Sequence, residues 1–182
     1  MIKGIALVLI DIQQGFDDPK WGSRNNPKAE EQASVLLNFF RENNLPFYHV
    51  QHLATEKESL LRADKPGVKI KPIVAPKEGE IVINKSVNSA FIGTDLKEVL
   101  EKGGMKTIVF VGLTTDHCVS TTARMAGNYG FRVIVISDAT ATFERQFNGK
   151  HFSAKVMHEV ALASLNKEFA EIMTTEELLK LL

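Results

Sequence analysis

The side chains of this 182-residue chain that could perform covalent catalysis are a thiol, a carboxylate and an ammonium group. Cys118 is the single cysteine, Asp11 directly follows the apolar run 5–10, and Lys85 follows the short apolar segment 81–83. A thiolate attacks carbonyl groups well, but a free cysteine is mostly protonated at neutral pH and needs a neighbouring base. Asp11 is suited to take the thiol proton, and Lys85 to hold the carboxylate and the thiolate in register. Together these groups suit acyl transfer through a thioester, followed by attack of water.

The segment that leads to Cys118 adds a further feature. The apolar run 107–111 is followed by Gly-Leu-Thr-Thr-Asp-His-Cys, so Cys118 lies near the expected start of a helix. Free backbone N–H groups and the helix dipole favour negative charge there. The N–H groups of the turn 112–118 could therefore bind an oxyanion. If Asp11 is the base, Asp11→Asn should leave a thiol that alkylates slowly at neutral pH.

Each of these residues also has a purely structural interpretation. A lone cysteine is most often a small buried apolar side chain, an aspartate can simply end a strand, and an isolated lysine is usually solvated. The catalytic interpretation rests on their convergence, because ligands of open parallel sheets bind beyond the carboxyl ends of the strands. The histidines offer less. His49 and His52 are three residues apart near a strand end, where regular strand geometry points them to opposite faces.

Apolar runs and helical spacings alternate along the chain. Strands are expected at 5–10, 46–50, 81–83, 107–111, 132–136 and 168–172, and helices at 28–43, 94–102, 116–129, 151–165 and 174–182. This alternation predicts one three-layer α/β/α domain over residues 1–182, Rossmann-like, with a six-stranded, mostly parallel sheet of order 3-2-1-4-5-6. The long segment 53–80 is charged and proline-rich, and a loop of that length in a compact domain is more often functional than idle.

Composition argues against several classes of function. The 22 basic and 22 acidic residues balance, and no basic stripe indicates a nucleic-acid partner. No apolar stretch is long enough to span a bilayer, and the first apolar run lacks the cleavage site of a signal peptide. One cysteine permits no internal disulfide, which suits a reducing compartment. We therefore expect a cytoplasmic protein with no nucleic-acid or membrane partner.

Three stretches of the chain resemble motifs of the isochorismatase-like cysteine hydrolase superfamily. ALVLIDIQQGF resembles its opening motif with the catalytic aspartate, INKSVNSAFIGTDLKEVL its lysine motif, and VFVGLTTDHCVSTTARMAGNYGFRVIVISDATATF its nucleophile motif with the strand that follows. The resemblance covers nearly the whole chain and implies that Asp11, Lys85 and Cys118 form a catalytic triad. It also implies a cis peptide bond between Leu113 and Thr114, which in the family turns N–H groups into an oxyanion hole that includes Cys118.

The resemblance also bears on cofactor and substrate. Nicotinamidases of the superfamily carry an Asp-x-His metal motif soon after the second strand, where this chain reads HVQHLATEKES. We therefore expect no metal and no other cofactor, and nicotinamidase-like activity becomes an alternative. Isochorismatases are similar in fold but lack the cysteine, so the function expected is metal-independent hydrolysis of a small amide or urea-like C–N bond. The expected substrate-pocket residues are Gln13, Phe16, Trp21, Asn88, Phe91 and His117.

Other functions fit the same alternation of strands and helices. A nucleotide-binding Rossmann domain would need a Gly-x-Gly-x-x-Gly turn after the first strand, and Asp-Ile-Gln-Gln-Gly does not supply one. A thiol redox protein or a non-catalytic binding protein would use the same fold without hydrolysis. The partners expected are a small-molecule substrate and other copies of the chain, as a dimer or tetramer. The apolar helix 151–165 would suit burial by a neighbouring helix, although core burial explains it nearly as well.

Overall fold

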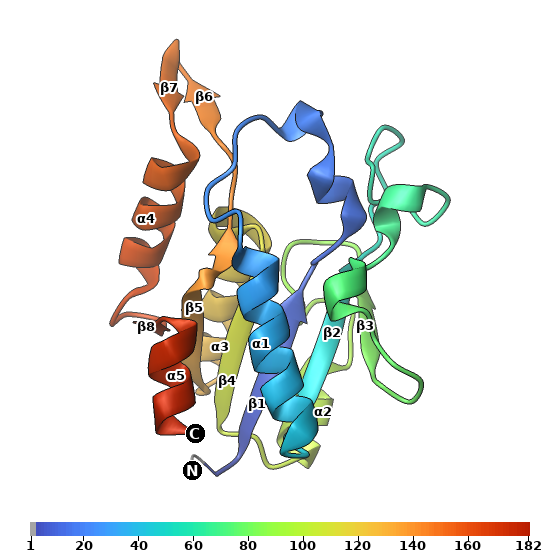
Figure 1. Cartoon of the computed structure of the whole chain (residues 1–182), viewed down its shortest axis with the longest axis vertical. Coiled ribbons are helices and arrows are strands. Elements are labelled where there is room, and N and C mark those ends of the chain that lie inside the picture. Colours follow the sequence, from blue (N-terminus) through green and yellow to red (C-terminus); the bar gives the residue numbers. More distant parts are fainter. Residues whose placement is uncertain (1–2) are drawn as a thin grey trace.

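A six-stranded parallel sheet forms the centre of the protein, in a computed structural model that describes residues 3–182 (Figure 1). The strand order is β3-β2-β1-β4-β5-β8, which confirms the predicted order 3-2-1-4-5-6 with β8 as the sixth strand. Met1 and Ile2, part of the predicted domain 1–182, lie outside the described residues. The strands of the sheet are β1 Ile5–Ile10, β2 Phe47–His52, β3 Val82–Lys85, β4 Thr107–Leu113, β5 Arg132–Ala141 and β8 Glu171–Met173.

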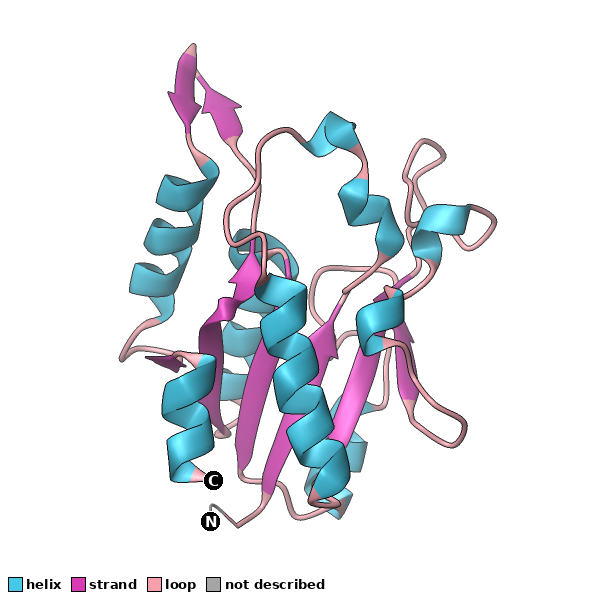
Figure 2. Ribbon diagram, in the orientation of Figure 1, coloured by secondary structure: helices cyan, strands magenta, loops and turns pink. Residues whose placement is uncertain are grey.

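Helices cover both faces of this sheet (Figure 2). They are α1 Ala29–Glu42, α2 Leu96–Lys102, α3 Ser120–Asn128, α4 Ala154–Leu165 and α5 Thr175–Leu181. Apolar side chains of α1 and α5 pack on one face, and those of α2 and α3 pack on the other with Leu165 of α4. Every residue of β1 and β4 is buried, because both faces of these central strands are covered. Among residues 3–182, no helix has the length and apolar character needed to cross a membrane.

A β-hairpin precedes α4, where the sequence predicted the start of the helix. Strands β6 (Arg145–Phe147) and β7 (Lys150–Phe152) pair in antiparallel fashion and extend beyond the sheet (Figure 1). Between them, Asn148 and Gly149 have φ values of 49° and 72°, the positive values that a two-residue hairpin turn requires. The predicted helix 151–165 is therefore wrong at its first end. His151 belongs to β7, and α4 begins after Ser153, whose hydroxyl caps it by accepting from Val156 N–H.

Several strands run further than their apolar cores, and this places polar residues at the carboxyl edge of the sheet. β2 continues to His52 and β3 to Lys85, and these two residues are direct neighbours in the parallel register. Lys85 is thus the last residue of a strand rather than part of a loop. β4 approaches β1 closely at Gly112, where a Cβ atom would lie 2.0 Å from the carbonyl oxygen of Ile10 and φ is +119°. Glycine is the residue that this approach permits.

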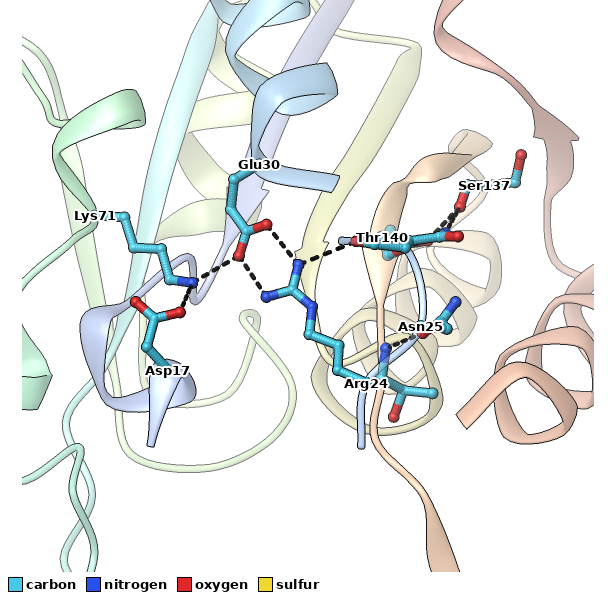
Figure 3. Close-up of polar contacts among 9 residues, drawn as sticks. Asp17, Arg24, Asn25, Glu30, Lys71, Ser137 and Thr140 are labelled. Carbon is cyan, nitrogen blue, oxygen red and sulfur yellow. Dashed lines mark hydrogen bonds and ion pairs between the residues drawn. The ribbon is translucent and has the colours of Figure 1, made fainter. Parts of the chain in front are cut away.

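A buried ion network fastens two loops to α1 at the same end of the sheet (Figure 3). Glu30, in the first turn of α1, accepts a fork from Arg24 and a hydrogen bond of 2.7 Å from Lys71. Lys71, from the long loop 53–80, also pairs with Asp17 of the loop after β1. Burial alone would raise the pKa of Glu30, but the hydrogen bonds from Arg24 and Lys71 outweigh burial and lower this pKa to about 2. The network therefore depends on an ionised Glu30.

We predict that Glu30→Gln lowers the free energy of unfolding by about 3 kcal/mol at neutral pH, because it leaves two buried cations short of a partner. The pKa of Glu30 is lowered on folding, so its contribution is complete above the ordinary value of 4.5 and is lost as the pH falls toward about 2. Urea denaturation of the native and variant proteins at several pH values measures this. The difference between them should shrink across that acid interval.

Glu101→Gln is the matched control, because Glu101 forms only an exposed pair with Lys97. It should change the free energy of unfolding by less than about 0.5 kcal/mol. An equal loss for Glu101→Gln and Glu30→Gln would contradict the importance of the buried network.

Self-association stays a prediction. The solvent-facing side of α4 exposes Val156 by 42% and Val160 by 60%, and the neighbouring β6 exposes Phe147 by 68%. Burying these side chains between two copies would remove apolar surface from water. Light scattering at micromolar concentration should give a mass above 20.2 kDa, and Val160→Lys should lower it. A monomeric mass for the native protein would contradict the prediction.

Candidate active site

The carboxyl ends of β1, β3 and β4 bring Asp11, Lys85 and Cys118 into one buried cluster. Lys85 Nζ lies 2.6 Å from Asp11 Oδ2 and 3.4 Å from Cys118 Sγ. The side chains of Lys85 and Asp11 are 0% and 1% exposed, and Cys118 is 8% exposed. Lys85 starts two strands away from Asp11, and its long side chain spans the end of β2. An ammonium, a carboxylate and a thiol thus meet within hydrogen-bond distance and almost out of contact with water.

The backbone between β4 and α3 presents the thiol to this cluster. The peptide bond between Leu113 and Thr114 is cis, and one π-type turn, Thr115–Val119, follows before α3 begins. The predicted helix 116–129 is therefore wrong at its first end, because residues 116–119 belong to this wider turn and α3 begins at Ser120. The N–H groups of His117 and Val119 both donate to the carbonyl oxygen of Thr114 at 3.2 Å. The assignment of Leu113, Thr114 and Cys118 to an oxyanion hole stays a prediction.

The electrostatics of the cluster keep the resting thiol protonated. Burial, and then the negative charge of Asp11, raise the pKa of Cys118 to about 12, against the opposing effect of Lys85. Burial also raises the pKa of Asp11, and Lys85 opposes that shift. Among residues 3–182, the buried Asp11 Oδ1 has no hydrogen-bond partner, and a carboxylate oxygen of Asp11 lies within 4.8 Å of the Cys118 sulfur. Asp11 thus has one free acceptor atom in the same buried cluster as the thiol.

His52 is a fourth member of the cluster, which sequence analysis did not select. Its Nδ1 lies 2.9 Å from Lys85 Nζ. The signal that could have found it is the parallel register of β2 and β3, which makes His52 and Lys85 neighbours. Potential metal-ligand atoms of Asp11, His52 and Cys118 all lie within 4.8 Å of one another, and these atom types suit zinc. The Lys85 ammonium lies within 3.4 Å of all three side chains, so a metal would have to displace this positive charge.

The predicted pocket residues take different positions. Asn88 Nδ2 lies 3.6 Å from Cys118 Sγ, and the side chain of His117, next to Cys118 in the chain, is 56% exposed. Phe16 and Trp21 pack against each other with ring centroids 5.3 Å apart. Phe91 is buried in the core, where its ring meets that of Tyr129.

Gln13 differs from the other five, because its side-chain amide is used within the protein. Gln13 is fully buried, and its oxygen accepts from His52 N–H at 2.9 Å. Its nitrogen donates to the carbonyl oxygens of His52 and Val68 at 3.0 and 2.7 Å. Gln13 therefore joins the loop after β1 to the end of β2 and to the loop 53–80.

Comparison with known proteins shows which chains this protein resembles. The isochorismatase domain model matches residues 5–177. The uncharacterized isochorismatase family protein YrdC of Bacillus subtilis is 47% identical over 96% of this chain and 94% of its own. Nicotinamidase 3 of Arabidopsis thaliana is 38% identical over 97% of this chain and 87% of its own. A solved isochorismatase-family structure from Chromobacterium violaceum matches with a TM-score of 0.93 and 41% identity, over 96% of this chain and 91% of that one.

We predict that Asp11→Asn abolishes turnover but makes Cys118 alkylate faster at neutral pH, the opposite of the expectation from sequence. The reason is that the charge of Asp11 raises the pKa of the thiol while Lys85 lowers it, and only Lys85 remains in the variant. Iodoacetamide alkylation at about pH 8, followed by mass spectrometry, should be at least about tenfold faster than in the native protein. Asp64→Asn, on the exposed part of loop 53–80, is the control and should alkylate at the native rate. Slower alkylation of Asp11→Asn would contradict this account of the site.

Proposed function

Because this chain belongs to the isochorismatase family of hydrolases, we propose that it is a cysteine hydrolase that cleaves a small amide or urea-like C–N bond. The observation that carries the proposal is the buried cluster of Asp11, Lys85 and Cys118 at the carboxyl edge of the sheet. A buried ion pair beside a thiol is costly to desolvate and is of little use to a simple core. Groups of this kind in this position are what covalent acyl transfer requires.

The proposed reaction has two stages that use the same residues. Cys118 sulfur attacks the carbonyl carbon while Asp11 takes the thiol proton, and the oxyanion forms beside the N–H groups of the turn 113–118. When the tetrahedral intermediate collapses, the C–N bond breaks and the leaving nitrogen takes the proton from Asp11. Water then attacks the thioester with Asp11 again as base, the acid leaves, and the thiol regains its proton. Lys85 keeps Asp11 oriented and offsets the negative charge that passes between sulfur and carboxylate.

The chemistry of the nearby side chains supports a small polar substrate. Asn88 has an amide group beside the sulfur, suited to a hydrogen bond with a substrate oxygen or nitrogen. Thr114 Oγ1 is buried and, within residues 3–182, has no hydrogen-bond partner, so a substrate group could satisfy it. A nicotinamidase-like amidase is the second candidate. It is favoured by the 38% identity with Nicotinamidase 3 of Arabidopsis thaliana. Either activity needs only a small-molecule partner.

The thiol-redox alternative fits the site less well. Cysteines that sense oxidants are exposed and hold a thiolate at neutral pH. Cys118 is buried, and its pKa is raised to about 12 by burial and by Asp11. A non-catalytic binding role would leave the close approach of Asp11, Lys85 and Cys118 without a purpose. A cytoplasmic location stays a prediction.

We predict that the purified protein hydrolyses at least one compound in a screen of small amides, ureas and nicotinamide, with acid and amine release as the readout. Cys118→Ala should lower turnover by at least about 1000-fold. Cys118→Ser should keep the fold and lose the thioester, which mass spectrometry detects on the native chain after rapid quenching. Addition of EDTA should leave the rate unchanged, since the Lys85 ammonium already occupies the position a metal would take.

Lys180→Ala, an exposed change on α5, is the control and should retain native turnover. Hydrolysis that survives in Cys118→Ala would contradict the nucleophile, and activity that EDTA removes and zinc restores would contradict the metal-free mechanism.

A further inference from the structure

The proposed reaction leaves His52 without a role, although its imidazole touches the triad. Its Nδ1 lies 2.9 Å from Lys85 Nζ, and the two residues are register partners at the ends of β2 and β3. A histidine at this distance from an ammonium accepts a hydrogen bond, because Lys85 has donors only. Nδ1 is therefore the acceptor, and His52 is neutral with its proton on Nε2.

The Lys85 ammonium has more acceptors than hydrogens. Four atoms lie within hydrogen-bond reach of Nζ: Asp11 Oδ2 at 2.6 Å, His52 Nδ1 at 2.9 Å, the carbonyl oxygen of Val87 at 3.1 Å and Cys118 Sγ at 3.4 Å. An ammonium donates three hydrogen bonds. The sulfur, as a neutral thiol, is the weakest acceptor of the four. In the resting protein the three hydrogens therefore point at Asp11, His52 and Val87.

The distribution of the three Lys85 hydrogens among these acceptors changes once negative charge appears on the sulfur. An anionic sulfur competes for a hydrogen much better than a neutral one, because its full negative charge attracts the ammonium. Asp11 Oδ2 retains its hydrogen because this contact is 2.6 Å long and the thiol proton goes to the other carboxylate oxygen, and Val87 contributes a backbone carbonyl held by the chain. The neutral imidazole is the side-chain acceptor that can give up its hydrogen to the sulfur.

We propose that His52 is a positioning residue that holds one hydrogen of the Lys85 ammonium away from Cys118 until negative charge develops on the sulfur. This inference rests on the proposed hydrolase function and deepens it. A hydrogen that His52 engages at rest keeps the thiol from being activated in the absence of substrate, and the cost is the His52 hydrogen bond that is given up when charge develops on the sulfur.

The surroundings of His52 are built to keep it in this place and in this protonation state. Both its backbone N–H and its carbonyl are held by the side-chain amide of Gln13. The titratable groups that face it are Lys85, Asp11 and Glu56. Burial and Lys85 lower the pKa of His52, against Asp11 and Glu56, which keeps the imidazole neutral at physiological pH. Gln13 therefore positions His52 indirectly, through hydrogen bonds to its backbone N–H and carbonyl groups.

The experiment compares variants of the full chain that remove or retain the acceptor. In His52→Leu the freed hydrogen should turn to the sulfur of the resting thiol and lower its pKa by about one unit. Iodoacetamide alkylation of Cys118 at about pH 8 should then be about tenfold faster than in the native protein. For the best substrate, kcat should stay within about threefold of native or rise, and KM should change less than about twofold, because the hydrogen bond to the charged sulfur is available in both proteins and binding is untouched. His52→Ala is the second acceptor-free variant, in case leucine prevents folding.

Two comparison variants make the test specific. In His52→Asn the amide oxygen lies where Nδ1 was, so alkylation and kcat should stay within about threefold of native. His151→Leu removes an exposed histidine of β7 that pairs with Glu144, and it should match the native protein in both measurements. A structural role alone would lower thermal stability without accelerating alkylation.

Several results would overturn the proposal. Alkylation of both acceptor-free variants at or below the native rate would show that His52 does not hold a hydrogen away from the sulfur, and equal acceleration in His52→Asn would exclude the acceptor as the cause. One bound metal per chain in elemental analysis, lost in His52→Leu, would make His52 a ligand instead. Failure of the native protein to hydrolyse any amide, with the alkylation pattern intact, would reject the proposed function and leave the Lys85–His52 link standing.

Discussion

The buried ion pair of Lys85 and Asp11 is the interaction on which the rest of the site depends. An ammonium and a carboxylate almost wholly removed from water are tolerated only when both are paired and hydrogen-bonded. The protein meets this requirement with atoms from three strand ends: the side chain of Asp11 after β1, the imidazole of His52 on β2, and the carbonyl oxygen of Val87 just after β3. The thiol is a fourth, weaker acceptor of the same ammonium, at 3.4 Å from Lys85 Nζ.

The geometry of the strands fixes the positions of Lys85 and Asp11. β1, β2 and β3 are adjacent and parallel, so their carboxyl ends lie at one edge, and rigid strands rather than mobile loops carry His52 and Lys85. β4 reaches the same edge on the other side of β1, because Gly112 lets its backbone pass close to Ile10. The turn that follows then delivers Cys118 next to Asp11. Reacting groups held on such elements keep their geometry better than groups on loops.

A second set of buried charges holds the loops above this edge. Glu30 gathers Arg24 and Lys71, and through Lys71 the loop 53–80 is joined to the loop after β1 (Figure 3). Gln13 adds a neutral link between the same two loops and β2. The two networks differ in what they leave free. In the Glu30 network the carboxylate is shared between two cations, whereas in the cluster of Asp11, Lys85 and Cys118 one carboxylate oxygen, Asp11 Oδ1, has no hydrogen-bond partner among residues 3–182. That spare acceptor distinguishes the candidate site from the structural network.

The sequence by itself located the strands of the sheet and selected Asp11, Lys85 and Cys118 as neighbours at one edge, because buried parallel strands are continuous apolar runs and the polar residues after them must share one edge. The ends of the strands and helices were predicted less accurately. Apolar runs end before the strands do, so Lys85 was assigned to a loop. The hairpin around Asn148-Gly149 was missed. Only the tertiary structure decided that His52 contacts Lys85 and that the side chain of Gln13 holds the backbone of His52. Both depend on strand register and on which of several polar groups reaches a given atom, and these are properties of distance that spacing along the chain does not encode.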